Sequence, residues 1–315
     1  IASDQKGNII IYSVKENKEI FKYNFYKKQY KKINKVLNLI IENNILYISD
    51  NIGFLYAYNF KKNKIIWAKN YKIPFRSNFK IMNNILVGAN QNNELIFFNK
   101  ENGKIIKSIP TEETTVKNKF INNLSLSENS LFFLNTYGSL YSINPLNLKI
   151  NWFLNLNSSL DLNPGNLFDG NEVVVDQGKV LITSDKSIYL LDEKNGTIIY
   201  KQNISSAIKP IILNNYLFLI TKNSFLVSLD FNTGKILYSY DIKTKISEFL
   251  NIKKNKNKIS IKNLLIANND LFIILKNSYS LNLSLNGNIK SINKLPSKII
   301  SQPIFVNNTM LYLNS

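Results

Sequence analysis

The feature that most restricts the fold of this chain is an internal repeat: an alternating strand, a turn and a second strand. The clearest copies run from Gly53 to Trp67 and from Gly138 to Trp152. In both, an Asn ends the first strand and a Trp follows eight positions later. The same separation is kept in Ser13–Phe21, Asn59–Trp67, Asn99–Lys107, Asn144–Trp152, Asp192–Tyr200, Asp230–Tyr238 and Leu283–Ser291. The copies follow one another at intervals of 38 to 53 residues, and a motif that recurs at such intervals predicts a repeat architecture.

The turn of each copy has a preferred residue four places after the position that ends the first strand, which is most often Asn or Asp. Glycine fills this position in Gly103, Gly196, Gly234 and Gly287, and asparagine fills it in Asn17 and Asn63. These residue types favour a left-handed backbone, so we expect a tight turn at this position in each copy.

A further partial copy lies at the C-terminus, where the segment from Pro303 to Leu313 matches the segment from Pro210 to Ile220. Both ends of the sequence cut into a repeat. We therefore expect a slightly trimmed protein of eight units that form one domain over residues 1–315.

Each unit contains three or four apolar runs of strand length, separated by Asn, Gly, Asp and Lys. Four-stranded units at a spacing of 38 to 53 residues predict an all-β fold, an eight-bladed β-propeller of four-stranded antiparallel blades. A linear β-solenoid is the alternative, and the long period argues against it. We see no helical stripe, and residues 251–262 are interpreted as an insertion or a longer hairpin.

The chain contains no His and no Cys, which removes Ser-His and Cys-His catalysis, disulfides and Cys zinc sites. The adjacent acids Glu112-Glu113 and Asp192-Glu193 would point to opposite faces of a strand and make poor acid/base pairs. We expect a protein that is not an enzyme and binds no cofactor or metal.

The net charge of +19 raises the possibility of a polyanion partner. However, Arg76 is the single arginine, and nucleic-acid readers rely on arginine for bidentate contacts. The abundance of Lys, Asn and Ile is typical of AT-rich codon usage, so we expect no specific nucleic-acid partner. The clusters Lys27, Lys28, Lys31 and Lys32, beside Tyr26 and Tyr30, and Lys253, Lys254, Lys256 and Lys258 are interpreted as solvated loops.

In idealised form the repeat is Gly-x-Leu-Tyr-Ala-x-Asn-x-x-x-Gly-Lys-x-x-Trp, which resembles the PQQ-type propeller repeat. The resemblance covers essentially the whole chain. Among proteins with this repeat, the chain is similar to the BamB family. In these propellers the side chain at the Trp position docks against the neighbouring blade. The resemblance assigns this docking role to Phe21, Trp67, Trp152, Tyr200 and Tyr238.

Membership in the BamB family would imply a non-catalytic scaffold that docks on the POTRA domains of BamA and helps to deliver unfolded outer-membrane proteins. It would also imply a periplasmic location at the inner leaflet of the outer membrane, through a lipid anchor that this sequence does not include. The alternatives are a PQQ-binding quinoprotein-related enzyme, or an interaction module with another ligand. Quinoprotein dehydrogenases are typically much longer chains than this one and often contain a vicinal disulfide, which a chain without cysteine cannot form.

One connection resembles the loop through which BamB contacts BamA, of the form Ser-Leu-Ser-Leu-Arg-Gly. Leu160 and Leu162 match its two leucines, and Asn163 stands where that family has arginine. The resemblance therefore implies a partner-binding site at these three residues. Alternatively, the leucines continue a strand into the core.

The same connection is rich in acids, with Asp161, Asp169, Glu172 and Asp176. Their spacing fits no EF-hand calcium loop, so a solvated acidic loop is favoured over a calcium site.

Overall fold

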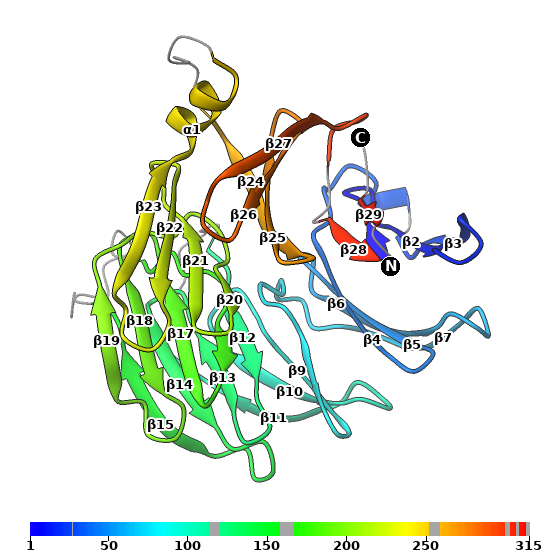
Figure 1. The fold of residues 1–315 in the computed structure, drawn as a ribbon. Helices are drawn as coiled ribbons and strands as arrows, with labels where there is room; N and C mark the ends of the chain where they lie inside the picture. Colours follow the sequence, from blue (N-terminus) through cyan, green and yellow to red (C-terminus); the bar gives the residue numbers. More distant parts are fainter. Residues whose placement is uncertain are drawn as a thin grey trace. The chain divides into compact units, whose positions relative to one another are not determined.

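The computed structural model describes residues 1–26, 28–113, 120–157, 167–251, 259–299, 303–306 and 309–312. The chain divides into two compact units, Ile1–Val173 and Val174–Ser315, which are described separately here as unit 1 and unit 2. Figure 1 shows that both are built almost entirely of strands.

Unit 1 contains four antiparallel sheets whose strands follow one another in chain order, as Figure 1 shows by colour. The first sheet consists of β1 (Ala2–Ser3), β2 (Asn8–Ser13) and β3 (Lys18–Asn24). A 3₁₀ turn at Lys28–Tyr30 precedes β4 (Leu37–Glu42), β5 (Ile45–Asp50), β6 (Phe54–Asn59) and β7 (Lys64–Asn70). The remaining two sheets are β8 (Lys80–Met82), β9 (Ile85–Ala89), β10 (Leu95–Asn99) and β11 (Ile105–Ile109), then β12 (Asn123–Leu126), β13 (Leu131–Leu134), β14 (Ser139–Ile143) and β15 (Ile150–Asn155).

Unit 2 contains three four-stranded sheets and a two-stranded one among its described residues. The first two are β16 (Val174–Asp176), β17 (Lys179–Thr183), β18 (Ile188–Asp192) and β19 (Ile198–Gln202), then β20 (Ile211–Leu213), β21 (Tyr216–Ile220), β22 (Phe225–Asp230) and β23 (Ile236–Asp241). The others are β24 (Ile261–Ala267), β25 (Asp270–Leu275), β26 (Tyr279–Ser284) and β27 (Ile289–Lys294), then the hairpin β28 (Ile304–Val306) and β29 (Thr309–Leu311).

The core lies between neighbouring sheets and is supplied mainly by their middle strands. In β10, for example, the apolar side chains from Leu95 to Phe98 are all buried, because both faces of this strand are covered. One continuous cluster joins the sheet β8–β11 to the sheet β12–β15 through Phe97, Phe133 and their neighbours. These near-continuous apolar runs are what a strand buried on both faces requires.

The hairpins β2–β3, β6–β7, β10–β11, β14–β15, β18–β19, β22–β23 and β26–β27 are called the outer hairpins, and the second strand of each is the outer strand. All seven carry a β-bulge at the same register position. In β6–β7, Trp67 pairs with Ala57 and Ile65 pairs with Tyr58, so Ile66 is the extra residue. A bulge bends a strand and interrupts its ladder, and it is common at sheet edges.

The predicted all-β class is confirmed, but the prediction of eight blades is wrong, because the fold has seven. The described residues contain seven bulged outer hairpins, and the C-terminal hairpin β28–β29 is not one of them. By sequence, β28–β29 corresponds to the first two strands of a sheet, whereas β1–β3 corresponds to the last three. Neither end is a complete four-stranded sheet, and counting each as a separate repeat gave one blade too many.

The turn of each outer hairpin adopts the predicted left-handed backbone. The φ angle is +70° at both Gly103 and Gly234, and +49° at Asn63. In the fourth repeat this position is held by Leu148, with a φ of +56°, a residue type that rarely adopts this conformation. The turn geometry is thus kept even where the preferred residue is absent.

The sequence predicted no helix, yet α1 (Ile242–Phe249) follows β23 directly (Figure 1). The carboxylate of Asp241 caps it by accepting a hydrogen bond of 2.9 Å from the main-chain N–H of Lys243. Ile242 and Ile246, four residues apart, are buried in the core of the sheets β20–β23 and β24–β27. The helix belongs to an insertion whose residues 252–258 lie outside the described residues.

Candidate functional site

Three of the predicted docking residues donate hydrogen bonds to the outer-hairpin turn of the next sheet. The indole Nε1–H of Trp67 donates to the carbonyl oxygen of Lys100 at 3.0 Å. The hydroxyl of Tyr200 donates to the carbonyl oxygen of Phe231 at 3.1 Å, and that of Tyr238 to Leu285 at 2.5 Å. These side chains therefore join adjacent sheets within each unit.

The other two docking residues make ring contacts. The ring of Phe21 lies 5.5 Å from that of Tyr58 in the next sheet, centroid to centroid. The ring of Trp152 lies 5.8 Å from that of Phe132 in its own sheet. The contribution of all five side chains to stability stays a prediction.

Lys107 takes part in the same kind of contact, which sequence reasoning missed. It occupies the Trp position of β11, and its ammonium donates a hydrogen bond of 2.6 Å to the carbonyl oxygen of Leu148 in the next outer-hairpin turn. Its aliphatic stem can cover apolar surface while the ammonium reaches the carbonyl. The eight-residue spacing was the signal that could have identified it.

The predicted partner-binding residues Leu160, Leu162 and Asn163 lie outside the described residues, but both ends of their connection are described. The main-chain N–H of Leu156 donates to the carbonyl oxygen of Gly138, and that of Phe168 to Thr136, each at 2.8 Å. Leu156 and Phe168 are buried. The connection therefore leaves and rejoins the fold at a single turn, between β13 and β14.

A polar network fixes that turn to the preceding sheet. The carboxylate of Glu112 accepts hydrogen bonds from the side chains of Asn135 at 2.7 Å, Ser139 at 2.5 Å and Tyr141 at 3.0 Å. The hydroxyl of Thr136 donates to the Oδ1 of Asn93 at 2.9 Å. Burial raises the pKa of Tyr141, and the charge of Glu112 adds to this effect. Since three donors occupy the carboxylate, Glu112 serves as a structural acceptor here.

The sequence left a calcium site at Asp161, Asp169, Glu172 and Asp176 as the disfavoured alternative. Of these four acids, Asp161 lies outside the described residues. Within the described ranges, no group of three or more acidic side chains gathers closely enough to hold a metal ion. Asp176 ends β16 and accepts a hydrogen bond of 3.2 Å from the side chain of Gln177.

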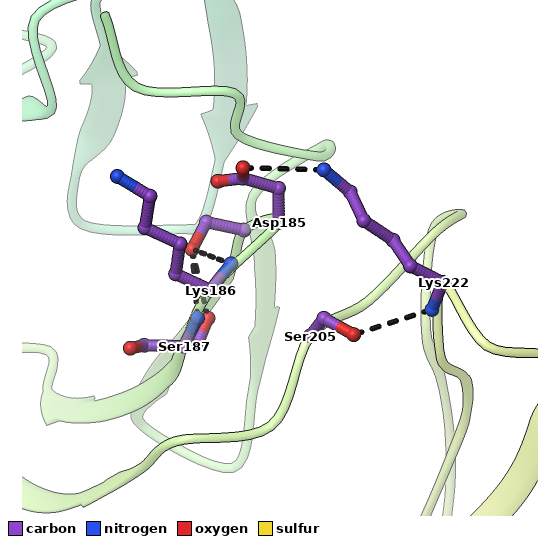
Figure 2. Close-up of polar contacts among 6 residues, drawn as sticks. Asp185, Lys186, Ser187, Ser205 and Lys222 are labelled. Carbon is purple, nitrogen blue, oxygen red and sulfur yellow. Dashed lines mark hydrogen bonds and ion pairs between the residues drawn. The ribbon is translucent and has the colours of Figure 1, made fainter. Parts of the chain in front are cut away.

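In unit 2, the turn between β21 and β22 contacts both the turn between β17 and β18 and the connection between β19 and β20, as Figure 2 shows. The Nζ of Lys222 lies 3.1 Å from the Oδ2 of Asp185, which belongs to the second-to-third strand turn of the preceding sheet. The main-chain N–H of Lys222 donates to the Oγ of Ser205, in the connection between β19 and β20, at 3.2 Å. A half-exposed ion pair contributes little to stability, so these contacts mainly fix the relative positions of the turns.

The aromatic residues interleaved with the first lysine cluster pack within the fold. The hydroxyl of Tyr26 donates to the Oδ2 of Asp50 at 2.6 Å, and the ring of Tyr30 lies 5.6 Å from that of Phe54. These rings are used in packing, which leaves them poorly placed as stacking platforms for bases. Lys27 and the four lysines of the second cluster lie outside the described residues.

In the described part of the chain, the helices fall short of the length and apolar character needed to span a bilayer.

Comparison with known proteins gives one family and several similar folds. The family model described as outer membrane protein assembly factor BamB matches residues 5–240. The crystal structure of BamB from Moraxella catarrhalis has a TM-score of 0.78 at 12% identity, covering 100% of this chain and 90% of that chain. The computationally designed Ika8 protein has a TM-score of 0.72 at 10% identity, covering 98% of this chain and 88% of that chain. A search of curated proteins gave no match. At these identities the structural likeness shows the fold, a PQQ-like propeller.

Proposed function

Because this chain belongs to the family of outer membrane protein assembly factor BamB, we propose that it is a non-catalytic scaffold of the machinery that assembles outer-membrane β-barrel proteins. In this function it binds BamA through the POTRA domains and helps unfolded outer-membrane proteins toward insertion. Its activity is binding alone, without a cofactor or a chemical step. The proposed location is the periplasm, with attachment to the inner leaflet of the outer membrane through a lipid anchor.

The observation that carries the proposal is the family match over residues 5–240. This stretch includes the whole connection between β15 and β16, where the resemblance to the BamA-binding loop lies. The match is therefore relevant to the site as well as to the repeats.

The proposed contact with BamA uses Leu160 and Leu162, with Asn163 beside them. Apolar side chains in a partner-facing loop are suitable anchors for an interface. The hydrogen bonds of Leu156 and Phe168 to the turn between β13 and β14 support this assignment. A loop held at both ends loses less conformational entropy on binding than one that is free. Asn163 lacks the charge and the forked donors of arginine, so it should contribute less than arginine does in the family.

The experiment measures binding of the full chain to the POTRA region of the cognate BamA by surface plasmon resonance. The variant Leu160→Ala/Leu162→Ala should weaken binding by about 2 kcal/mol or more, as truncation of hot-spot residues does. The matched control is Ile33→Ala/Val36→Ala, which removes two exposed branched side chains from another connection between sheets. The control should bind like the wild type.

Two results would count against the proposal. Unchanged affinity of the leucine double variant would remove the loop from the interface. Loss of thermal stability with unchanged affinity would show that the leucines belong to the core. Conversely, a gain of affinity in Asn163→Arg would support the match to the family loop.

A further inference from the structure

Three lysines of unit 2 come together at the end of the sheet β24–β27 where β25 finishes: Lys262, Lys276 and Lys298, called the lysine triad below. The main-chain N–H of Lys276, in the turn between β25 and β26, donates to the carbonyl oxygen of Ser260 at 2.9 Å, just before β24. The ammonium of Lys262 donates to the carbonyl oxygen of Ile299, the residue that follows Lys298. Three separate segments of the chain therefore each bring one lysine to this place.

A β-bulge sets the direction of the Lys262 side chain. Ile261 pairs with Leu275 and Asn263 pairs with Ile274, so Lys262 is the extra residue of β24. A bulge re-aims the side chain that it carries, and bulges are common beside binding sites. The half-buried position of Lys262 is thus built into the strand.

The members of the triad repel one another. Burial lowers the pKa of Lys262, and the neighbouring charges of Lys298 and Lys276 lower it further. Neither Lys276 nor Lys298 forms an ion pair with an acidic side chain in the described part of the chain. Because like charges held together cost free energy, an anion placed among them would be bound favourably.

The sequence around the triad offers almost no acid to balance it. Residues 249–315 contain nine lysines and a single acidic residue, Asp270. Asp270 begins β25, at the opposite end of that strand from Lys276, and it pairs there with Lys290. The segments that form the triad therefore supply no carboxylate to it.

The preceding sheet shows how a lysine at the same place in its turn is balanced. Lys222 and Lys276 each stand two residues before a serine with left-handed backbone, at φ angles of +65° and +68°. The ammonium of Lys222 lies 3.1 Å from the carboxylate of Asp185 (Figure 2). Lys276 instead has the charge of Lys262 beside it. The positive charge is thus left for an external anion at one turn and matched within the chain at the other.

We propose that the lysine triad binds a phosphate group, either as the free ion or as the headgroup of an anionic phospholipid. A phosphate group offers several strong acceptor oxygens, so it can face one ammonium from each of the three segments. Lysine binds phosphate in this way, as a point charge. A carboxylate, with one negative charge, would balance a single ammonium. The inference goes beyond the proposed function, because binding of BamA does not require it.

The experiment follows thermal unfolding of the full chain in about 10 mM sodium phosphate and in sodium chloride of equal ionic strength. The matched ionic strength separates binding from screening. Phosphate should raise the melting temperature of the wild type by about 2 °C or more relative to chloride. Calorimetric titration with sodium phosphate measures the affinity directly.

The test variant is Lys276→Met, and its matched control is Lys290→Met, which removes one charge from the opposite end of the same sheet. Lys276→Met should weaken phosphate binding about tenfold, because it removes one charged hydrogen-bond donor. The control should change binding by less than about twofold. In chloride, Lys276→Met should be at least as stable as the wild type, since it removes a repelling charge. Lys262→Met should also weaken binding, and if it fails to fold, Lys276→Met decides alone.

Vesicles distinguish the two sources of the phosphate group. Co-sedimentation with vesicles of equal parts phosphatidylglycerol and phosphatidylcholine, lost in Lys276→Met and kept in Lys290→Met, would assign a lipid headgroup. Calorimetric binding of sodium phosphate without such co-sedimentation would assign the free ion.

Equal phosphate effects in the wild type and both variants would overturn the inference, since the effect would then be general. It would also fail if Lys276→Met left phosphate binding unchanged but weakened binding to the POTRA region, because the triad would then contact BamA. If phosphate binding depends on the triad and the POTRA region does not bind the chain, the inference holds and the proposed function fails.

Discussion

The indole N–H of Trp67, on the outer strand of one sheet, donates a 3.0 Å hydrogen bond to the carbonyl oxygen of Lys100 in the outer-hairpin turn of the next sheet. Its ring packs over Gly103 of the same turn. A single side chain thus joins two sheets by burying an aromatic ring and by pairing a main-chain carbonyl. The hydrogen bond to a main-chain carbonyl oxygen of the next outer-hairpin turn recurs at Lys107, Tyr200 and Tyr238.

Replacing Trp67 tests how much this joint contributes. Trp67→Ala should lower the free energy of unfolding by about 3–5 kcal/mol, because it removes a large buried aromatic side chain. Trp67→Phe keeps a ring but leaves the carbonyl of Lys100 without its donor, and should cost about 1 kcal/mol from the lost hydrogen bond, before any loss of packing. Urea unfolding measures both values. A cost below about 1 kcal/mol for the Ala variant would show that Trp67 does not support the fold.

Two glycines with the same backbone angle separate packing from backbone strain. Gly103 has a φ of +70° and Gly178 a φ of +69°. A Cβ on Gly103 would lie 2.8 Å from the Trp67 ring, whereas a Cβ on Gly178 would meet nothing within 4 Å. Gly178→Ala should cost about 1 kcal/mol from strain alone, and Gly103→Ala should cost about 1–3 kcal/mol more because the ring must move. Equal shifts of melting temperature in the two variants would contradict the packing of Trp67 over Gly103.

Lys107 offers a test of the charged form of the joint. Lys107→Met keeps an apolar stem and removes the ammonium that donates to the carbonyl of Leu148. The loss of this hydrogen bond should lower stability by about 1 kcal/mol. Lys104→Met, in the turn just before β11, is the control for removing one positive charge from an exposed position. If both variants unfold at the same urea concentration, the ammonium of Lys107 does not join the sheets.

Ionisation of Tyr200 should make the free energy of unfolding depend on pH. Burial raises the pKa of its hydroxyl to about 12, and the charge of Asp230 adds to the shift. An unfolded tyrosine ionises near pH 10, so folding favours the neutral form. This contribution is complete below pH 10 and disappears as the pH rises from 10 to about 12. Tyr200→Phe should therefore show a shallower loss of stability than the wild type between these pH values, in urea unfolding at matched pH. Parallel losses in the two proteins would contradict the burial of this hydroxyl.

Sequence reasoning predicted the all-β class because the eight-residue spacing survives where the residue types change. It miscounted the blades because β28–β29 resembles β20–β21, and a resemblance between segments does not say whether they begin a new repeat. It missed α1 because Ile242 and Ile246 also suit a strand, and a helix of eight residues gives a weak periodic signal.

The site was harder to predict than the fold, for physical reasons. Glu112 meets donors 23, 27 and 29 residues away, and such contacts leave no local pattern in a sequence. Lys107 was missed because its role in joining two sheets depends on its ammonium reaching the carbonyl oxygen of Leu148, which lies 41 residues away in the sequence. The residues Leu160, Leu162 and Asn163 stay a prediction from family resemblance.

The most direct test of the central claim is calorimetric titration of the wild-type full chain with the POTRA region of its cognate BamA, and separately with PQQ in the presence of calcium. A non-catalytic scaffold of the BamB family should bind the POTRA region saturably, with a Kd of about 1 μM or tighter, and should give no binding signal with PQQ. Binding of PQQ at about micromolar affinity, together with no heat from the POTRA region, would contradict the account and favour a quinoprotein-related enzyme.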